Sequence, residues 1–165
     1  MNGILLLSLA VLLAVPTAHS ADGCLRSARK VAIPGARSIV VVAEGQCEPR
    51  SVGSYSLRVY AGTNPRFPYD DFVTGIVRSR DGTVEDVRVS DLDRDESPEI
   101  IIIVRSSGTG GYLSADAFRL RGTVLTLLGS VSSLPKDADP IRALEAELKN
   151  DAEQRAAPDA DKPRR

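Results

Sequence analysis

The chain has 165 residues and a net charge of −1 at pH 7, with 21 basic and 22 acidic residues. This balance disfavours a nucleic-acid-binding protein, which usually carries a basic surface. The only histidine, His19, lies in an N-terminal segment that we expect to be removed. The remaining chain then lacks the commonest general base and the ligand of most zinc sites, so the composition also disfavours an enzyme. No motif indicates a cofactor.

The N-terminal segment is typical of a secretory signal peptide. The apolar run over residues 3–15 is too short to span a bilayer, and Ala18 and Ser20 are small residues at positions −3 and −1 of a cleavage site. We therefore expect residues 1–20 to be cleaved and the mature protein to be exported, with no later membrane span. A lipoprotein is less favoured, because the residues before Cys24 do not match the usual lipidation signal.

The two cysteines of the chain, Cys24 and Cys47, both lie after this signal segment. In an oxidising compartment an isolated pair is most simply one disulfide. We predict a structural Cys24–Cys47 bridge, which would stabilise the fold by about 3 kcal/mol in the chain-entropy model.

Short strands separated by turn signals dominate the chain from residue 30 onward. Residues 54–60 alternate polar and apolar side chains, as a half-buried antiparallel strand does. Residues 38–43 are rich in β-branched side chains and are expected to be buried on both faces. The candidate strands cover residues 30–33, 38–43, 54–60, 73–78, 84–89, 99–105, 115–120 and 123–131. About eight strands at close intervals predict an all-β sandwich or barrel, in a domain over residues 21–135.

Two glycine-containing turns predict hairpins. Asp81-Gly82 and Arg121-Gly122 each separate two candidate strands, and Asp-Gly between strands is a strong hairpin signal. The arginines of these strands, such as Arg80, are expected to fill solvated faces.

The segment from Ala61 to Phe72 contains two prolines and is therefore unsuited to a central strand. It is interpreted as an ordered loop. Its aromatic residues, Phe67, Tyr69 and Phe72, are expected to cap the core rather than to contact a ligand.

The chain becomes helical in character after Leu134. Asp139 is a typical N-cap, and Pro140 occupies the first helical position. A thin apolar stripe at helical spacing follows, formed by Ile141, Leu144 and Leu148. We predict an amphipathic helix within residues 136–155 that docks weakly or only in an assembly, which leaves a homodimer open. Residues 156–165 are charged, small and proline-containing, and are expected to be disordered.

Acidic residues alternate at Asp91, Asp93 and Asp95, which is the spacing that calcium loops use. However, Arg94 and Glu96 stand where such loops usually have glycine or another small residue. The simpler interpretation is an acidic turn whose side chains cap backbone amides. The three aspartates remain the candidate metal ligands of an alternative function, a calcium-dependent adhesion or structural module of the cell envelope.

A glycine-rich stretch follows the most apolar of the candidate strands. Three glycines allow a narrow loop with positive φ angles, and hydroxyl groups lie among them. The residues of this loop are Ser107, Gly108, Thr109, Gly110, Gly111 and Tyr112. The pattern lacks the third glycine of a dinucleotide fingerprint and the lysine of a phosphate-binding loop. It is typical either of a wide hairpin connection or of a thin loop that enters the cleft of another molecule.

Four stretches in the same order resemble the bacterial periplasmic inhibitors of invertebrate-type (i-type) lysozyme. They are residues 53–60, 68–72, 91–100 and 105–118, and the resemblance covers roughly residues 40–128. It implies a β-sandwich in the periplasm that protects the cell wall by inserting a loop of the form Ser-Gly-x-Tyr into the active-site cleft of an i-type lysozyme.

The positions that match this loop are Thr109, Gly110, Gly111 and Tyr112, so threonine replaces the expected serine. A lysozyme cleft holds two carboxylates, to which the two hydroxyl groups would hydrogen-bond. Ser107 with Gly108 lies just upstream and offers an alternative hydroxyl.

Two arginines near the loop in sequence, Arg105 and Arg119, are expected to pair with acidic residues at the rim of the cleft. A third hypothesis, a hydrolase of wall material that uses a pair of carboxylates, is left open by the many acidic residues.

Overall fold

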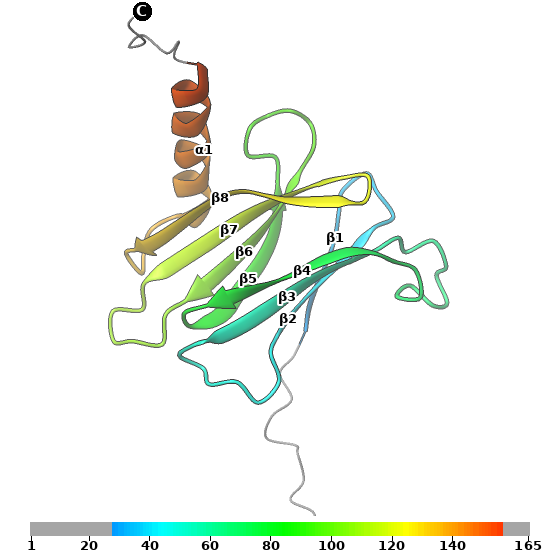
Figure 1. Ribbon diagram of the computed structural model, residues 1–165, viewed down its shortest axis with the longest axis horizontal. Helices are drawn as coiled ribbons and strands as arrows, with labels where there is room; N and C mark the ends of the chain where they lie inside the picture. The colour runs from blue at the N-terminus through cyan, green and yellow to red at the C-terminus, as the bar shows by residue number, and fades with distance from the viewer. Residues whose placement is uncertain (1–27, 157–165) are drawn as a thin grey trace, which may run out of the picture.

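The computed structural model describes residues 28–156, which form two four-stranded antiparallel sheets and one helix (Figure 1). The first sheet contains, in spatial order, β1 (Arg29–Ala32), β2 (Ile39–Glu44), β3 (Gly53–Tyr60) and β4 (Phe72–Arg80). The second contains β5 (Thr83–Ser90), β6 (Glu99–Arg105), β7 (Leu113–Arg121) and β8 (Val124–Leu134), followed by α1 (Pro140–Ala156). The predicted eight-stranded sandwich with a C-terminal helix is confirmed. The predicted signal peptide, Cys24 and nearly all of the predicted disordered tail lie outside the described residues.

The main core lies between the two sheets. Val40 and Val42 of β2 are buried there against residues of β3, with Val40 opposite Val59 and Val42 opposite Leu57. The other residues of β2, such as Val41, are only half-buried. The expectation that this strand is buried on both faces is therefore wrong, because within residues 28–156 no helix or strand covers the outer face of the first sheet.

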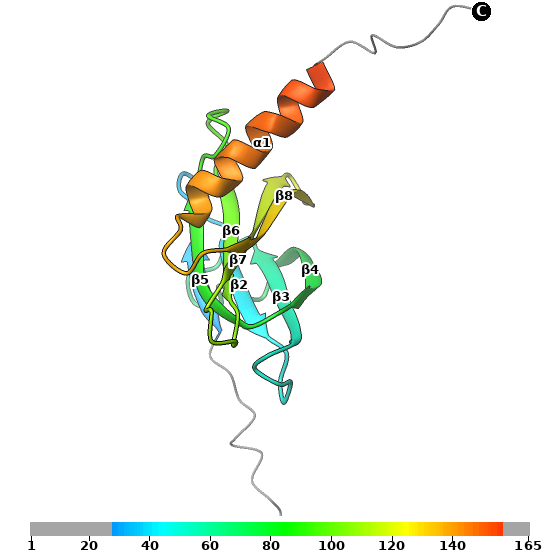
Figure 2. The ribbon, with the colours of Figure 1, turned by 90° about the vertical axis from the view of Figure 1, so that its left-hand side faces the viewer.

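The strand buried on both faces is β6. Ile100, Ile102 and Val104 belong to the core between the sheets, whereas Ile101 and Ile103 pack with Leu144 of α1. The helix covers the outer face of β7 and β8 (Figure 2). The expectation that it docks only in an assembly is wrong, because Leu144 is fully buried within its own chain, whereas weak docking stays a prediction. A homodimer stays a prediction.

The helix begins as predicted. The Asp139 carboxylate accepts hydrogen bonds from the amides of Ile141 (3.0 Å) and Arg142 (3.4 Å), so Asp139 is the N-cap before Pro140. The C-terminal half of α1 extends beyond the sheet (Figures 1 and 2). Between residues 28 and 156, no helix is long and apolar enough to cross a membrane.

The two predicted hairpins have different outcomes. The turn at Arg121-Gly122 joins the paired strands β7 and β8, as predicted. The turn at Asp81-Gly82 does not form a hairpin, because β4 pairs with β3 and β5 pairs with β6. It carries the chain from the first sheet to the second. At this crossing the buried guanidinium of Arg80 donates to the Gly82 carbonyl, a contact that stabilises the turn.

The proline-containing loop between β3 and β4 is confirmed as a loop, but its aromatic residues do not cap the core. Phe67, Tyr69 and Phe72 are 56%, 41% and 57% exposed. Tyr69 and Phe72 contact the ring of Tyr60 edge-on, with centroids 5.5 and 5.9 Å away. These rings therefore pack on each other at the surface.

Candidate functional site

Three connections meet at one end of the sandwich, at the lower left of Figure 1. They are the glycine-rich loop (residues 106–112, between β6 and β7), the loop over residues 45–52 between β2 and β3, and the Asp81-Gly82 turn. The Ser107 hydroxyl donates to the Arg50 carbonyl at 3.0 Å. A Cβ atom at Gly82 would collide with the backbone of Arg105, so the turn lies directly against the base of the glycine-rich loop.

The glycine-rich loop is closed by its own backbone. The Ser106 amide donates to the Tyr112 carbonyl at 2.8 Å, and the Gly111 amide donates to the Gly108 carbonyl at 3.0 Å. Gly111 has a φ of 54°, a conformation that favours glycine. The Tyr112 ring lies against Gly110, where a Cβ atom would strike it, and is 55% exposed. The result is a narrow, ordered loop that presents the side chains of Thr109 and Tyr112 to solvent.

The structure places Arg105 at the base of this loop. Its Nε and Nη2 atoms donate to the two carboxylate oxygens of Glu85, with an Nη2–Oε1 distance of 2.7 Å. Its Nη1 atom donates to the carbonyls of Gly111 (2.9 Å) and Lys136 (3.4 Å). The hydrogen bond with Arg105 lowers the pKa of Glu85, and the same bond raises the pKa of Arg105. Both side chains are therefore charged at neutral pH.

Arg80 contacts both connections that lie beside the glycine-rich loop, namely the loop over residues 45–52 and the Asp81-Gly82 turn. Its side chain is fully buried and ion-pairs with Glu44 (3.5 Å) and Glu48 (3.4 Å). It also donates to backbone carbonyls of Pro49 at 3.1 Å and Arg50 at 3.3 Å, in addition to Gly82. The expectation of a solvated arginine is wrong for this residue. No local signal in the sequence identifies Arg80 as a buried residue, because its two carboxylate partners come from β2 and from the loop that follows β2.

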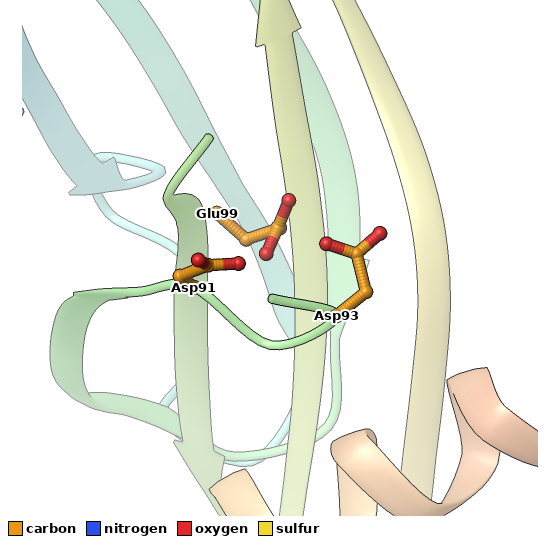
Figure 3. Close-up of side chains that lie close together, drawn as sticks. All are labelled: Asp91, Asp93 and Glu99. Atoms are coloured by element: carbon orange, nitrogen blue, oxygen red, sulfur yellow. The ribbon is translucent and has the colours of Figure 1, made fainter. Parts of the chain in front are cut away.

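The acidic residues gather at the other end of the second sheet (Figure 3). Carboxylate oxygens of Asp91, Asp93 and Glu99 lie within 4.8 Å of one another, so the structure brings together two of the three predicted aspartates and adds the buried Glu99. Asp91 accepts hydrogen bonds from the amides of Asp95 (3.1 Å) and Glu96 (3.0 Å). The turn thus has the amide-capping contacts expected of the simpler interpretation.

Arg119 compensates part of the charge of this acidic group. Its guanidinium donates to Asp93 and to Glu99, the latter at 2.7 Å, and lies 3.5 Å from Asp95. Partial burial acts to lower the pKa of Arg119, but the hydrogen bonds that it donates to Asp93 and Glu99 outweigh this effect and raise the pKa. A permanently charged side chain therefore occupies the position where a cation would bind, which disfavours the calcium module. Arg119 also lies at the far end of β7 from the glycine-rich loop, so the structure does not bring it to the predicted rim.

The predicted disulfide is only partly within the described residues. Cys47 lies in the loop over residues 45–52 and is not a free thiol. Cys24 lies outside residues 28–156, so the Cys24–Cys47 pairing stays a prediction.

Comparisons with known proteins agree with this arrangement. The family model described as "Periplasmic lysozyme inhibitor of I-type lysozyme" matches residues 26–148, which span the sandwich and the first half of α1. The crystal structure of the Aeromonas hydrophila periplasmic inhibitor of I-type lysozyme is 42% identical, with a TM-score of 0.68, and the match covers 72% of this chain and 99% of that chain. The same inhibitor in complex with Meretrix lusoria lysozyme gives 42% identity and a TM-score of 0.68, over 73% and 96% of the two chains. The search of the curated proteins gave no match.

Proposed function

Because the chain belongs to the family of periplasmic inhibitors of i-type lysozyme, we propose that it blocks such an enzyme by inserting the glycine-rich loop into the active-site cleft. The family consists of inhibitor proteins rather than enzymes, in agreement with the prediction from composition. One solved relative is in complex with a lysozyme from Meretrix lusoria, which supports a lysozyme as the partner of this chain. The observation that carries the proposal is the ordered, exposed loop over residues 107–112.

The chemistry of the loop fits a lysozyme cleft. Such a cleft holds one protonated and one ionised carboxyl group. The hydroxyl groups of Thr109 and Tyr112 are exposed donors, and a hydrogen bond to an ionised carboxylate is stronger than one between neutral groups. Gly110 and Gly111 keep the loop thin, which allows close approach of its backbone. Because the loop is ordered before binding, little conformational entropy is lost in the complex.

The neighbouring connections extend the contact surface. Val52 is 59% exposed and Asp81 is exposed, and both belong to connections that lie beside the glycine-rich loop. We expect them to contact the walls of the cleft while the loop fills its centre.

The proposal places the protein in the periplasm, which is where its family acts. Export would use the predicted signal peptide over residues 1–20. Mass spectrometry of the protein from a periplasmic extract should find Ala21 as the first residue, without a lipid on Cys24. Light scattering of the purified protein decides between a monomer and the homodimer that the sequence leaves open.

The test is lysis of a peptidoglycan suspension by an i-type lysozyme while the purified protein is titrated in. We expect stoichiometric inhibition of the i-type enzyme and much weaker effects on c-type and g-type lysozymes. Tyr112→Ala should weaken inhibition by about 30-fold or more, as expected for an aromatic anchor at the centre of an interface.

A matched control for this variant is Tyr69→Ala, which removes a tyrosine of similar exposure from a different loop. It should inhibit as the unmodified protein does. Undiminished inhibition by Tyr112→Ala would exclude insertion of this loop, and lack of inhibition by the unmodified protein would exclude the function itself.

A further inference from the structure

We propose that Arg105 is the positioning residue of the inhibitory loop: it acts chiefly by fixing the direction in which Tyr112 leaves the sandwich, rather than by contacting the lysozyme. This inference rests on the proposed function and revises the expectation that Arg105 lies at the rim of the cleft. It follows from the contacts of one guanidinium group with three separate segments of the chain.

The first contact anchors the arginine to the rigid part of the molecule. Glu85 lies on β5, and its carboxylate receives two hydrogen bonds from Arg105, one from Nε and one from Nη2. A two-point contact between a guanidinium and a carboxylate fixes orientation as well as distance. Glu85 therefore sets where the remaining nitrogen, Nη1, is directed.

The second contact reaches the residue that precedes Tyr112. Nη1 donates to the Gly111 carbonyl at 2.9 Å, and this carbonyl belongs to the peptide group that connects Gly111 to Tyr112. Gly111 has a φ of 54°, and glycine has more conformational freedom than any other residue, so contacts from outside the residue are needed to hold its backbone in one conformation. By holding this carbonyl, Arg105 fixes the peptide plane from which the exposed Tyr112 ring projects.

The hydrogen-bonding capacity of Arg105 argues against a rim contact. An arginine has five N–H donors. Four are used within this chain, two by Glu85 and one each by the carbonyls of Gly111 and Lys136. One donor is left for a lysozyme, so the side chain acts chiefly through the loop.

The experiment compares Arg105→Gln with Arg88→Gln in the lysozyme titration and in binding kinetics. Arg88 is an exposed arginine of β5, paired with Asp86 at 2.7 Å. Its variant therefore also removes one positive charge, but at a position distant from the glycine-rich loop. Arg105→Gln should weaken inhibition by about 10-fold, the effect of losing a hydrogen bond to a charged group, and Arg88→Gln should not weaken it. Equal inhibition by both variants would overturn the proposal.

Two further variants separate positioning from charge and from direct contact. Arg105→Lys keeps the charge but cannot bridge Glu85 and Gly111 in the same geometry, so it should lose nearly as much as Arg105→Gln. In a Tyr112→Ala background, Arg105→Gln should cause little additional loss, because the ring that it positions is gone. Full activity of Arg105→Lys, or an undiminished effect in the Tyr112→Ala background, would show that Arg105 acts on the lysozyme itself.

Hydrogen exchange on the free protein tests the same inference without a lysozyme. In Arg105→Gln, the amides of Ser106 and Gly111, which close the loop, should exchange about 10-fold faster, while those of β6 should be unchanged. If the unmodified protein does not inhibit, but the Ser106 and Gly111 amides exchange faster in Arg105→Gln, the positioning role holds and the proposed function is excluded. Unchanged exchange at both amides would exclude the positioning role whatever the inhibition assay shows.

Discussion

At the scale of single residues, Thr109 stands where the resemblance to the inhibitor family implies a serine. Threonine keeps the hydroxyl group of the expected serine and adds one methyl group. The residue is exposed at the tip of the loop and its side chain does not contact the core. The departure therefore concerns the complex with the lysozyme rather than the stability of the free protein.

Two substitutions at this position separate the hydroxyl group from the methyl group. Thr109→Val replaces the hydroxyl by a methyl of similar size and should weaken inhibition by about 10-fold or more, because a donor to a cleft carboxylate is lost. Thr109→Ser should inhibit at least as well as the unmodified protein. Dissociation constants for an i-type lysozyme, measured with melting temperatures as a check on folding, decide between these effects. Equal binding by Thr109→Val would assign the role of the hydroxyl to Ser107 or to Tyr112.

The glycine-rich loop could be located from the sequence, although its role in binding stays a prediction; the residues that support it could not be predicted. Thr109 and Tyr112 are recognisable because glycines and hydroxyl groups gather in one short stretch. Glu85 is 20 residues from Arg105, and the carboxylates that bind Arg80 come from β2 and the loop after it. Such pairs are created by the packing of the sheets, and no local pattern of residues predicts them.

At the scale of secondary-structure elements, α1 allows the second sheet to carry apolar residues on both of its faces. It covers Ile101 and Ile103, which would otherwise face solvent, and so allows β6 to be apolar along almost its whole length. The apolar stripe that predicts the helix is thin, with Ile141 and Leu148 only partly buried beside Leu144. Its contribution to stability therefore depends strongly on one residue.

Leu144→Ala tests this dependence. We expect the free energy of unfolding to fall by about 2–5 kcal/mol, the usual result of truncating a fully buried leucine. Glu147→Ala, on the exposed face of the same helix, should change it by less than about 0.5 kcal/mol. Denaturation in urea, followed by circular dichroism, gives both values. A similarly small change for Leu144→Ala would mean that the helix contributes little to the fold.

The errors of the sequence prediction also belong to this scale. All eight strands were located, because alternation and turn residues are local signals. The sheet to which each strand belongs is not a local property. At the Asp81-Gly82 turn, a sequence typical of a hairpin joins two different sheets, and the preceding Arg80 is buried in ion pairs with Glu44 and Glu48, which are distant in sequence. The aromatic residues of the proline-containing loop are a second example: their hydrophobicity suggests that they cap the core, but Tyr69 and Phe72 pack on Tyr60 at the surface.

At the scale of the whole molecule, the glycine-rich loop that we propose to be inhibitory and the acidic turn lie at opposite ends of the second sheet. β6 begins beside the acidic turn with its Arg119 ion pairs and ends beside the glycine-rich loop. The carboxylates of the acidic end are bound within the chain by backbone amides and by two arginines, Arg119 and Arg121. The other end presents a thin loop whose hydroxyl groups are directed to solvent. This asymmetry is what an inhibitor that engages its target with one end of a rigid sandwich requires.

The predicted Cys24–Cys47 disulfide would connect the N-terminal segment to the end of the sandwich that carries the glycine-rich loop. Cys47 lies in the loop over residues 45–52, whose Arg50 carbonyl accepts the hydrogen bond from Ser107. Reduction, or replacement of both cysteines by serine, should lower the free energy of unfolding by about 3 kcal/mol, since the unfolded chain regains the entropy of the open loop. Unfolding in urea with and without dithiothreitol measures the difference. The double serine variant should not respond to the reductant, which serves as the control. If the unmodified protein is equally stable in both conditions, the bridge does not stabilise the fold, and a peptide map of the oxidised protein would then identify the partner of Cys47.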